Sequence, residues 1–134
     1  MLKKYFTKKF KEKIIHYMMN NYKKIDVEPG AINYYLKCHL VSTHYAIKNG
    51  DKELALVLSL NKNNNWPVVH FINYNGNNFI DNSYGHLNLI YDYYLIKMIT
   101  KDQFFNTSNI LIRYQKKFSN MSNFLEKIFA DTNI

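Results

Sequence analysis

Residues 66–82 read Trp-Pro-Val-Val-His-Phe-Ile-Asn-Tyr-Asn-Gly-Asn-Asn-Phe-Ile-Asp-Asn, and this stretch carries the strongest fold signal in the chain. Two runs rich in β-branched and aromatic residues, 68–74 and 77–82, flank Asn75-Gly76, the dipeptide most typical of a two-residue hairpin turn. We therefore predict an antiparallel hairpin here. If the turn contains Asn75 and Gly76 alone, the resulting register places His70 directly opposite Asp81.

That register brings together two side chains capable of acid–base chemistry. Directly opposed residues share one face of a sheet, with Cβ atoms about 4.5–5.5 Å apart. At that separation the Asp81 carboxylate can accept a hydrogen bond from one imidazole nitrogen of His70 and leave the other nitrogen as a base. One extra residue in the turn would put Asn82 in the place of Asp81, and a wrong register leaves His86 as the alternative base.

The single cysteine, Cys38, lies upstream of the hairpin at the start of a second predicted helix, which runs to about Lys48 and ends at the capping signal Asn49-Gly50. Unpaired N–H groups and the helix dipole favour a thiolate at such a position and can help to hold an oxyanion. Cys38, His70 and Asp81 therefore have the types and order of a nucleophile, a base and an orienting group. The structural alternative is a buried thiol that packs as a small hydrophobe and a strand histidine in a satisfied polar pair.

The remaining periodicity predicts an α+β fold. Residues 54–60 form an apolar run typical of a buried strand, and a polar loop follows at 61–65. Residues 91–99 fit a strand, although 89–99 fit a helix equally well, and residues 110–114 fit a further strand. Asn123, with a glutamate three positions later, predicts the N-cap of a short C-terminal helix. The order is thus two helices followed mostly by strands.

Residues 3–25 are expected to form an amphipathic helix. Its apolar stripe contains Leu2, Phe6, Phe10, Ile14, Met18 and Tyr22, widened by Tyr17 and Ile25. Its other face carries Lys3, Lys4, Lys8, Lys9, Lys11 and Lys13. A helix packed on the core with a solvated lysine face explains this pattern, and a docking surface for nucleic acid or an acidic host protein is the functional alternative.

Length and composition set the class of protein. A chain of 134 residues and 16.1 kDa is one domain, which we divide into an N-terminal helix (1–28), a core (30–100) and a C-terminal strand and helix (101–134). The 47% hydrophobic content argues against disorder, and no apolar run approaches the roughly 20 residues of a membrane span. One cysteine and a charged N-terminus without an apolar leader favour a cytoplasmic protein.

The formal net charge of +8 is weaker evidence of a nucleic-acid partner than its size suggests. Arg113 is the one arginine among 18 basic residues, and asparagine is abundant. Such a lysine- and asparagine-rich composition is typical of AT-rich coding sequences whatever the function. Arginine is also the side chain best suited to bidentate phosphate and guanine contacts.

Three sequence segments resemble the papain-like cysteine hydrolases: Lys37-Cys38-His39 at the start of a helix, Pro67–Ile72 in a strand, and Gly76 with Phe79-Ile80-Asp81 on the returning strand. The resemblance covers roughly residues 30–100. It is nearest to the NlpC/P60-like and transglutaminase-like branches, which pack the nucleophile helix on an antiparallel sheet, and to small phage-borne proteins of that superfamily.

The resemblance implies acyl transfer through a thioester at Cys38: hydrolysis of an amide, peptide or isopeptide bond in a protein or peptide-like substrate, or transfer to an amine, without a cofactor. The glutamine that papain-type enzymes place before the cysteine is missing, and Asn33, Tyr34 and Tyr35 occupy that stretch. Asn33 is the candidate oxyanion donor, with Asn82 as a further oxyanion or orienting candidate.

Two other readings remain open. The first is a non-catalytic phage-type inhibitor or binding protein that docks through its basic surface. The second is a metal site formed by Cys38, His39 and His44, although the two histidines are five positions apart and miss the i, i+4 spacing of helical zinc ligands. Trp66, which precedes Pro67, is expected to pack in a loop or to form a wall of the cleft.

Overall fold

A computed structural model describes residues 1–33 and 37–134 and has an α+β architecture. A six-stranded sheet has the order β1-β6-β3-β4-β5-β2, in which β2 and β5 are parallel and the other pairs antiparallel. The helices are α1 (Leu2–Asn21), α2 (Cys38–Asn49), α3 (Thr107–Ser119) and α4 (Phe124–Phe129). The strands are β1 (Lys23–Ile25), β2 (Val27–Pro29), β3 (Glu53–Asn61), β4 (Trp66–Tyr74), β5 (Phe79–Asp81) and β6 (Tyr91–Thr100). Short 3₁₀ helices span Gly85–Ile90 and Lys101–Asn106.

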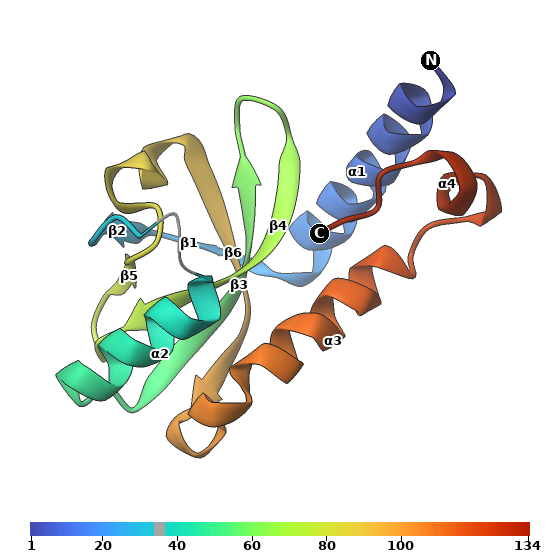
Figure 1. Cartoon of the computed structure of the whole chain (residues 1–134). Helices are drawn as coiled ribbons and strands as arrows, with labels where there is room; N and C mark the ends of the chain where they lie inside the picture. Colours follow the sequence, from blue (N-terminus) through green and yellow to red (C-terminus); the bar gives the residue numbers. More distant parts are fainter. Residues whose placement is uncertain (34–36) are drawn as a thin grey trace.

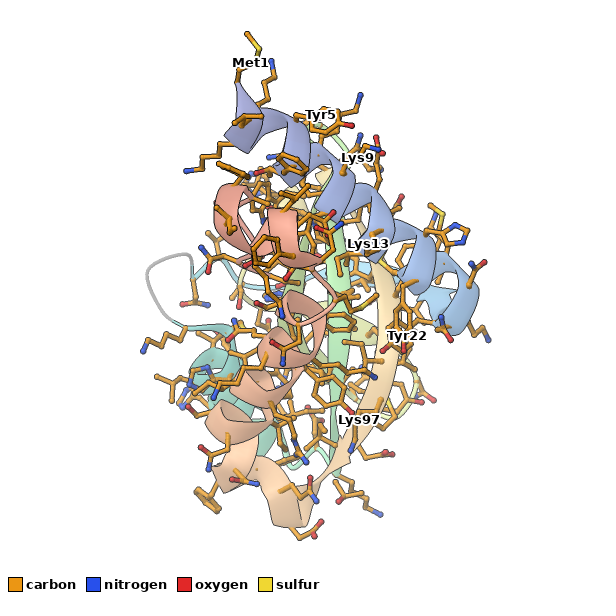
Figure 2. The ribbon with its side chains drawn as sticks, turned by 90° about the vertical axis from the view of Figure 1, so that its right-hand side faces the viewer. Met1, Tyr5, Lys9, Lys13, Tyr22 and Lys97 are labelled. Carbon is orange, nitrogen blue, oxygen red and sulfur yellow. The ribbon has the colours of Figure 1, made fainter. Side chains whose placement is uncertain are left out.

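The main core lies between the sheet and the helices α1 and α3 (Figures 1 and 2). Its buried side chains include Phe10, Ile14 and Met18 from α1, Ile110 and Phe118 from α3, and Leu54, Leu56 and Leu58 from β3. A smaller cluster of Ala55, Val57, Ile72 and Tyr93 lies on the opposite face of the sheet. The central strands β3 and β4 are therefore apolar on both faces, which explains their continuous hydrophobic runs.

Most of the predicted elements are confirmed. The apolar run 54–60 lies within β3, and α2 begins at Cys38 and ends before Gly50, whose φ of 70° makes it a left-handed C-cap. Residues 91–99 form a strand rather than a helix. The capping box at the start of α4 is present, with Asn123 and Glu126 each accepting a backbone N–H from the other.

Two predicted elements are wrong. The N-terminal helix ends at Asn21 instead of continuing to residue 25, and Ile25 belongs to β1, which pairs with β6. Residues 110–114 lie in the helix α3, so the C-terminal region 101–134 contains helices and no strand among its residues. The apolar content of this short window favours a strand, but the buried residues of α3, namely Thr107, Ile110 and Phe118, follow the spacing of one helix face.

The predicted hairpin register is also wrong, by two residues. Tyr74 pairs with Phe79 rather than with Asn77, because the turn spans Asn75–Asn78. The side chain of Asn75 stabilises this longer turn by accepting hydrogen bonds from the backbone N–H groups of Asn77 and Asn78, at 2.9 and 2.7 Å. A shift by an even number of residues keeps each side chain on its face of the sheet.

Beyond its short pairing with β5, the outer edge of β4 is covered by other parts of the chain. The backbone N–H of Val69 donates to the carbonyl of Ile134 at 3.0 Å, and the carbonyl of Phe71 accepts from the hydroxyl of Ser42 at 2.9 Å. The side chain of Asn73 donates to the carbonyl of Ser42 at 2.8 Å. Because α2 satisfies groups that β4 leaves unpaired, the start of α2 is held beside the strand that carries His70.

Within the described ranges, no helix has both the length and the apolar composition needed to cross a membrane.

Candidate active site

A pocket of about 460 Å³ opens where the start of α2, the edge of β4, the loop after β5 and one face of α3 meet. Cys38, His39 and His70 line it, together with Asn33 before α2 and Tyr84 after β5. The α3 side of the pocket is lined by Ser108, Leu111, Ile112 and Gln115. The thiol and the imidazole, which are 32 positions apart in the sequence, therefore face the same space.

His70 and Asp81 are joined by a hydrogen bond that is fully buried. The imidazole Nε2 lies 3.0 Å from Oδ2 of Asp81, and the two side chains are 3% and 0% exposed. An ionised carboxylate can only accept, so the ring donates its Nε2–H to Asp81. The other ring nitrogen, Nδ1, takes no part in this hydrogen bond.

Asp81 receives three further hydrogen bonds, which fix its orientation. The hydroxyl of Tyr93 donates to Oδ2 at 2.6 Å, while the backbone N–H groups of Ser83 and Tyr84 donate to Oδ1 at 2.8 and 3.0 Å. Burial raises the pKa of Asp81, but the charge of His70 and these donors outweigh burial and lower it below its ordinary value. Asp81 therefore remains an anion although it is buried.

An aromatic stack holds the imidazole from its face. The rings of His70 and Tyr84 are 4.4 Å apart and nearly parallel, at 4°, and Tyr84 in turn stacks on Tyr91 at 4.4 Å. The hydrogen bond that the ring donates to Asp81 fixes the ring in its own plane, and the stack limits tilting out of that plane. Together they leave the imidazole little rotational freedom.

The Cys38 thiol ionises readily in this pocket. Burial by itself raises its pKa, but the positive charge of His70, followed by hydrogen bonding with His39 and His70 and with the backbone of Phe71, lowers the pKa to about 6. Charge is thus the main coupling between Cys38 and His70, and hydrogen bonding is the smaller contribution. At neutral pH the thiol is largely a thiolate.

The pKa of His70 moves in the opposite direction. Burial lowers it, but the charges of Cys38 and Asp81 and the hydrogen bonds to both raise it well above its ordinary value. The lowered pKa of the thiol and the raised pKa of the imidazole both favour the thiolate–imidazolium form of the pair.

The two candidate asparagines have different surroundings. Asn33 lines the pocket, and its side-chain amide donates one hydrogen bond, at 2.8 Å, to the carbonyl of Asn82. Asn82 is buried between loops: its amide donates to Oδ1 of Asn73, and its Oδ1 accepts from the backbone of Ala31. Asn82 thus supports the segment that carries Asn33 and does not reach the pocket. Tyr34 and Tyr35 lie outside the described residues.

Two pocket residues escaped the sequence-based search. His39 and Ser83 are 8% and 4% exposed, and His39 Nδ1 and Ser83 Oγ have no hydrogen-bond partner in the described part of the chain. From the sequence, His39 is part of the Lys37-Cys38-His39 segment and a possible metal ligand, and no role in the pocket is predicted for it. Ser83 gives no sequence signal, because its position depends on the turn that follows β5.

Other candidates lie away from this pocket. His86 and His44 are exposed, and no group of three or more metal-ligating side chains gathers within residues 1–33 and 37–134. Trp66 borders two neighbouring cavities instead of the pocket itself. Lys13 does not belong to a solvated face, because its ammonium contacts the buried carboxylate of Glu126 at 2.5 Å.

No family model, curated protein or solved structure matches the chain.

Proposed function

We propose that this protein is a small cysteine hydrolase or acyltransferase of papain-like type, in which Cys38 is the nucleophile, His70 the acid–base group and Asp81 the orienting group. The observation that carries the proposal is the thiol itself, whose pKa is lowered to about 6, chiefly by the charge of His70 acting against burial. A cysteine whose only role is to pack in a core does not require a neighbouring positive charge that lowers its pKa. A free thiolate also suits a reducing compartment such as the cytoplasm.

The first half of the reaction forms a thioester. The Cys38 thiolate attacks the carbonyl carbon of an amide, a new C–S bond forms, and the π electrons move to the carbonyl oxygen. When the oxyanion collapses, the C–N bond breaks and the His70 imidazolium gives its proton to the departing amine. The products are a thioester on Cys38, a free amine and a neutral imidazole.

The second half returns the enzyme to its starting state. Neutral His70 takes a proton from water, or from an acceptor amine, as that nucleophile attacks the thioester carbon. Collapse of the second oxyanion expels the Cys38 thiolate and restores the ion pair. Asp81 stabilises the imidazolium at both ends of the cycle and keeps Nδ1 directed at the thiol.

Two donors are suited to hold the oxyanion. As the first residue of α2, Cys38 has a backbone N–H without a partner inside its own helix, at the positive end of the helix dipole. Asn33 lines the same pocket, and its amide has two N–H groups, of which one is donated to Asn82. This pairing of a backbone donor with a side-chain amide corresponds to the role of the missing glutamine.

The proposal is tested with an activated acyl donor such as a p-nitrophenyl ester. We expect a burst of p-nitrophenol close to one equivalent per chain and an acyl adduct on Cys38 by mass spectrometry. Cys38→Ser removes the burst, and His70→Ala slows it at least 100-fold. His44→Ala, a change of an exposed histidine on the same helix, leaves it intact. A full burst from Cys38→Ser would show that the proposal is wrong.

A further inference from the structure

A second cavity, of about 630 Å³, lies between α1 and the β3–β4 turn and is rich in lysine. Lys3, Lys4, Lys8 and Lys11 line it, together with Trp66 at the start of β4. Two carboxylates also line this lysine cavity, but Glu12 faces Lys8 at 4.0 Å, and Asp131 accepts hydrogen bonds from the backbone and the side-chain N–H groups of Asn133. The wall thus carries an excess of positive charge.

Trp66 gives this cavity a fixed aromatic wall. The ammonium of Lys11 lies 4.9 Å from the centre of the indole ring and donates a hydrogen bond to the carbonyl of Asn64 at 3.0 Å. Lys11 therefore anchors the turn to α1, whereas Lys3, Lys4 and Lys8 are exposed and free of such an anchoring role. The amino-terminal end of α1, with Met1, projects beyond the body of the protein (Figure 2).

A third cavity, of about 540 Å³, lies between the lysine cavity and the active-site pocket and shares lining residues with both. This middle cavity shares Val68, Ile112 and Gln115 with the active-site pocket and shares Trp66 with the lysine cavity. The three cavities therefore lie next to one another along β4, and we refer to them together as the groove. From Trp66 to His70 the strand advances four residues, or about 13 Å, which an extended peptide covers with about four residues.

We propose that this groove binds a polypeptide substrate that carries acidic residues about four positions from the bond that Cys38 attacks. This inference rests on the proposed function, because it names the substrate class of the same site. The apolar and amide side chains of Leu111, Ile112 and Gln115 contact the residues near the reacting bond. The lysines attract the acidic segment, and charge complementarity of this kind raises both affinity and the rate of association.

A binding measurement tests the lysine cavity independently of catalysis. The full chain with Cys38→Ser is titrated into fluorescein-labelled octaglutamate, with octaglutamine and a nine-nucleotide single-stranded DNA with eight phosphates as comparison ligands. We expect octaglutamate to bind at least ten times more tightly than octaglutamine and no more weakly than the DNA. Tighter binding of the DNA through the same lysines, or no binding of octaglutamate, would overturn the proposal.

Charge reversal locates the binding site. Lys3→Glu/Lys4→Glu/Lys8→Glu leaves the Lys11–Trp66 contact in place and is expected to weaken octaglutamate binding at least ten-fold. The control Lys48→Glu/Lys52→Glu/Lys101→Glu makes the same change of charge at exposed positions near the end of α2 and the start of β3, and it should weaken binding less than three-fold. Equal losses from both triple variants would mean that net charge alone attracts the peptide.

Alkylation by a reactive peptide tests whether one peptide can occupy the lysine cavity and reach Cys38 at the same time. Chloroacetyl peptides with four neutral residues and then four glutamates, in both chain directions, are compared with their glutamine analogues for alkylation of Cys38. In one direction the glutamate peptide should react about ten-fold faster, and the Lys3/Lys4/Lys8 reversal should remove the advantage. The glutamate and glutamine peptides could alkylate Cys38 at equal rates while iodoacetamide still alkylates it at low pH. That result would refute the substrate class but not the proposed function. An ordinary thiol pKa would refute the proposed function, and the lysine cavity would then not be a substrate site.

Discussion

His70 donates a hydrogen bond to Asp81 at 3.0 Å although the two residues are not paired across the hairpin. The pairing of β4 with β5 ends at Asn73 and Ile80, and Asp81 itself pairs with Pro29 of the parallel strand β2. The carboxylate reaches the imidazole diagonally, across two positions, while the turn that follows β5 supplies two backbone donors. The end of β5 and the turn that follows it therefore together fix the carboxylate that accepts the hydrogen bond from His70.

Asp81→Asn should disable the site and destabilise the fold. Asparagine keeps one acceptor oxygen but places an N–H group against groups that themselves donate to Asp81. We therefore expect the free energy of unfolding, measured with urea at pH 7, to fall by about 3 kcal/mol. The lowered pKa of Asp81 means that its charge stabilises the fold above the ordinary pKa of aspartate and that this stabilisation is lost as the pH falls through the lowered value.

The difference between the wild type and Asp81→Asn should accordingly shrink below about pH 4. Asp92→Asn is the matched control, because Asp92 makes only partly exposed ion pairs with Lys24 and Lys62, at 3.4 and 4.0 Å. It should change the unfolding free energy by less than about 1 kcal/mol. Equal effects of the two substitutions would mean that the buried network around Asp81 does not stabilise the protein.

Tyr93→Phe removes one donor from Asp81 and keeps the ring. The lost hydrogen bond, of 2.6 Å to a buried carboxylate, should cost about 1.5–3 kcal/mol in the unfolding free energy. Tyr74→Phe makes the same change where the hydroxyl donates to the carbonyl of Gly76 at the exposed turn, and it should cost less than about 0.5 kcal/mol. Chemical denaturation measures the unfolding free energies of both variants. A Tyr93→Phe protein as stable as the wild type would show that the hydrogen bond from Tyr93 to Asp81 does not stabilise the fold.

Features that depend on local sequence signals could be predicted. They are the helix α2, the strands β3 and β4, and the sheet face that His70 and Asp81 share. Apolar runs, the Asn49-Gly50 cap and the alternation of side chains along a strand are all visible within a few residues. The hairpin register was wrong by an even number, so the prediction still placed both residues on the same face.

The missed features depend on contacts between distant segments. Neither the closure of the β4 edge by Ser42 and Ile134 nor the donation from Tyr93 to Asp81 has a short-range signal. The strand predicted at 110–114 failed for a related reason: a five-residue window cannot distinguish a buried strand from one face of a helix. The position of Ser83 in the pocket likewise follows from the turn after β5.

Gly85 should tolerate a side chain less well than Gly50, although both have positive φ angles, of 56° and 70°. A Cβ at Gly85 would lie 2.2 Å from the side chain of Ile32 and 3.2 Å from the carbonyl of Ala31, whereas a Cβ at Gly50 meets nothing within 4 Å. Both alanine variants lose about 1 kcal/mol to backbone strain. Gly85→Ala should lose at least another 1 kcal/mol.

Because Gly85 follows Tyr84, the ring that stacks on His70, Gly85→Ala should also raise the pKa of Cys38 while Gly50→Ala leaves it unchanged. Thermal unfolding and alkylation kinetics of the two variants provide the comparison. If they were equally stable, the close contact of Gly85 with Ile32 would carry no energetic weight.

The central claim, that His70 makes Cys38 a thiolate at neutral pH, is tested most directly by the rate of Cys38 alkylation with iodoacetamide between pH 4.5 and 9.5. The chain has one cysteine, so every adduct reports on this thiol. The account predicts a midpoint near pH 6 for the wild type and for His44→Ala, and a midpoint above pH 8 for His70→Ala, where burial raises the thiol pKa without an opposing charge. A wild-type midpoint near 8.5, or one that His70→Ala does not move, would contradict it.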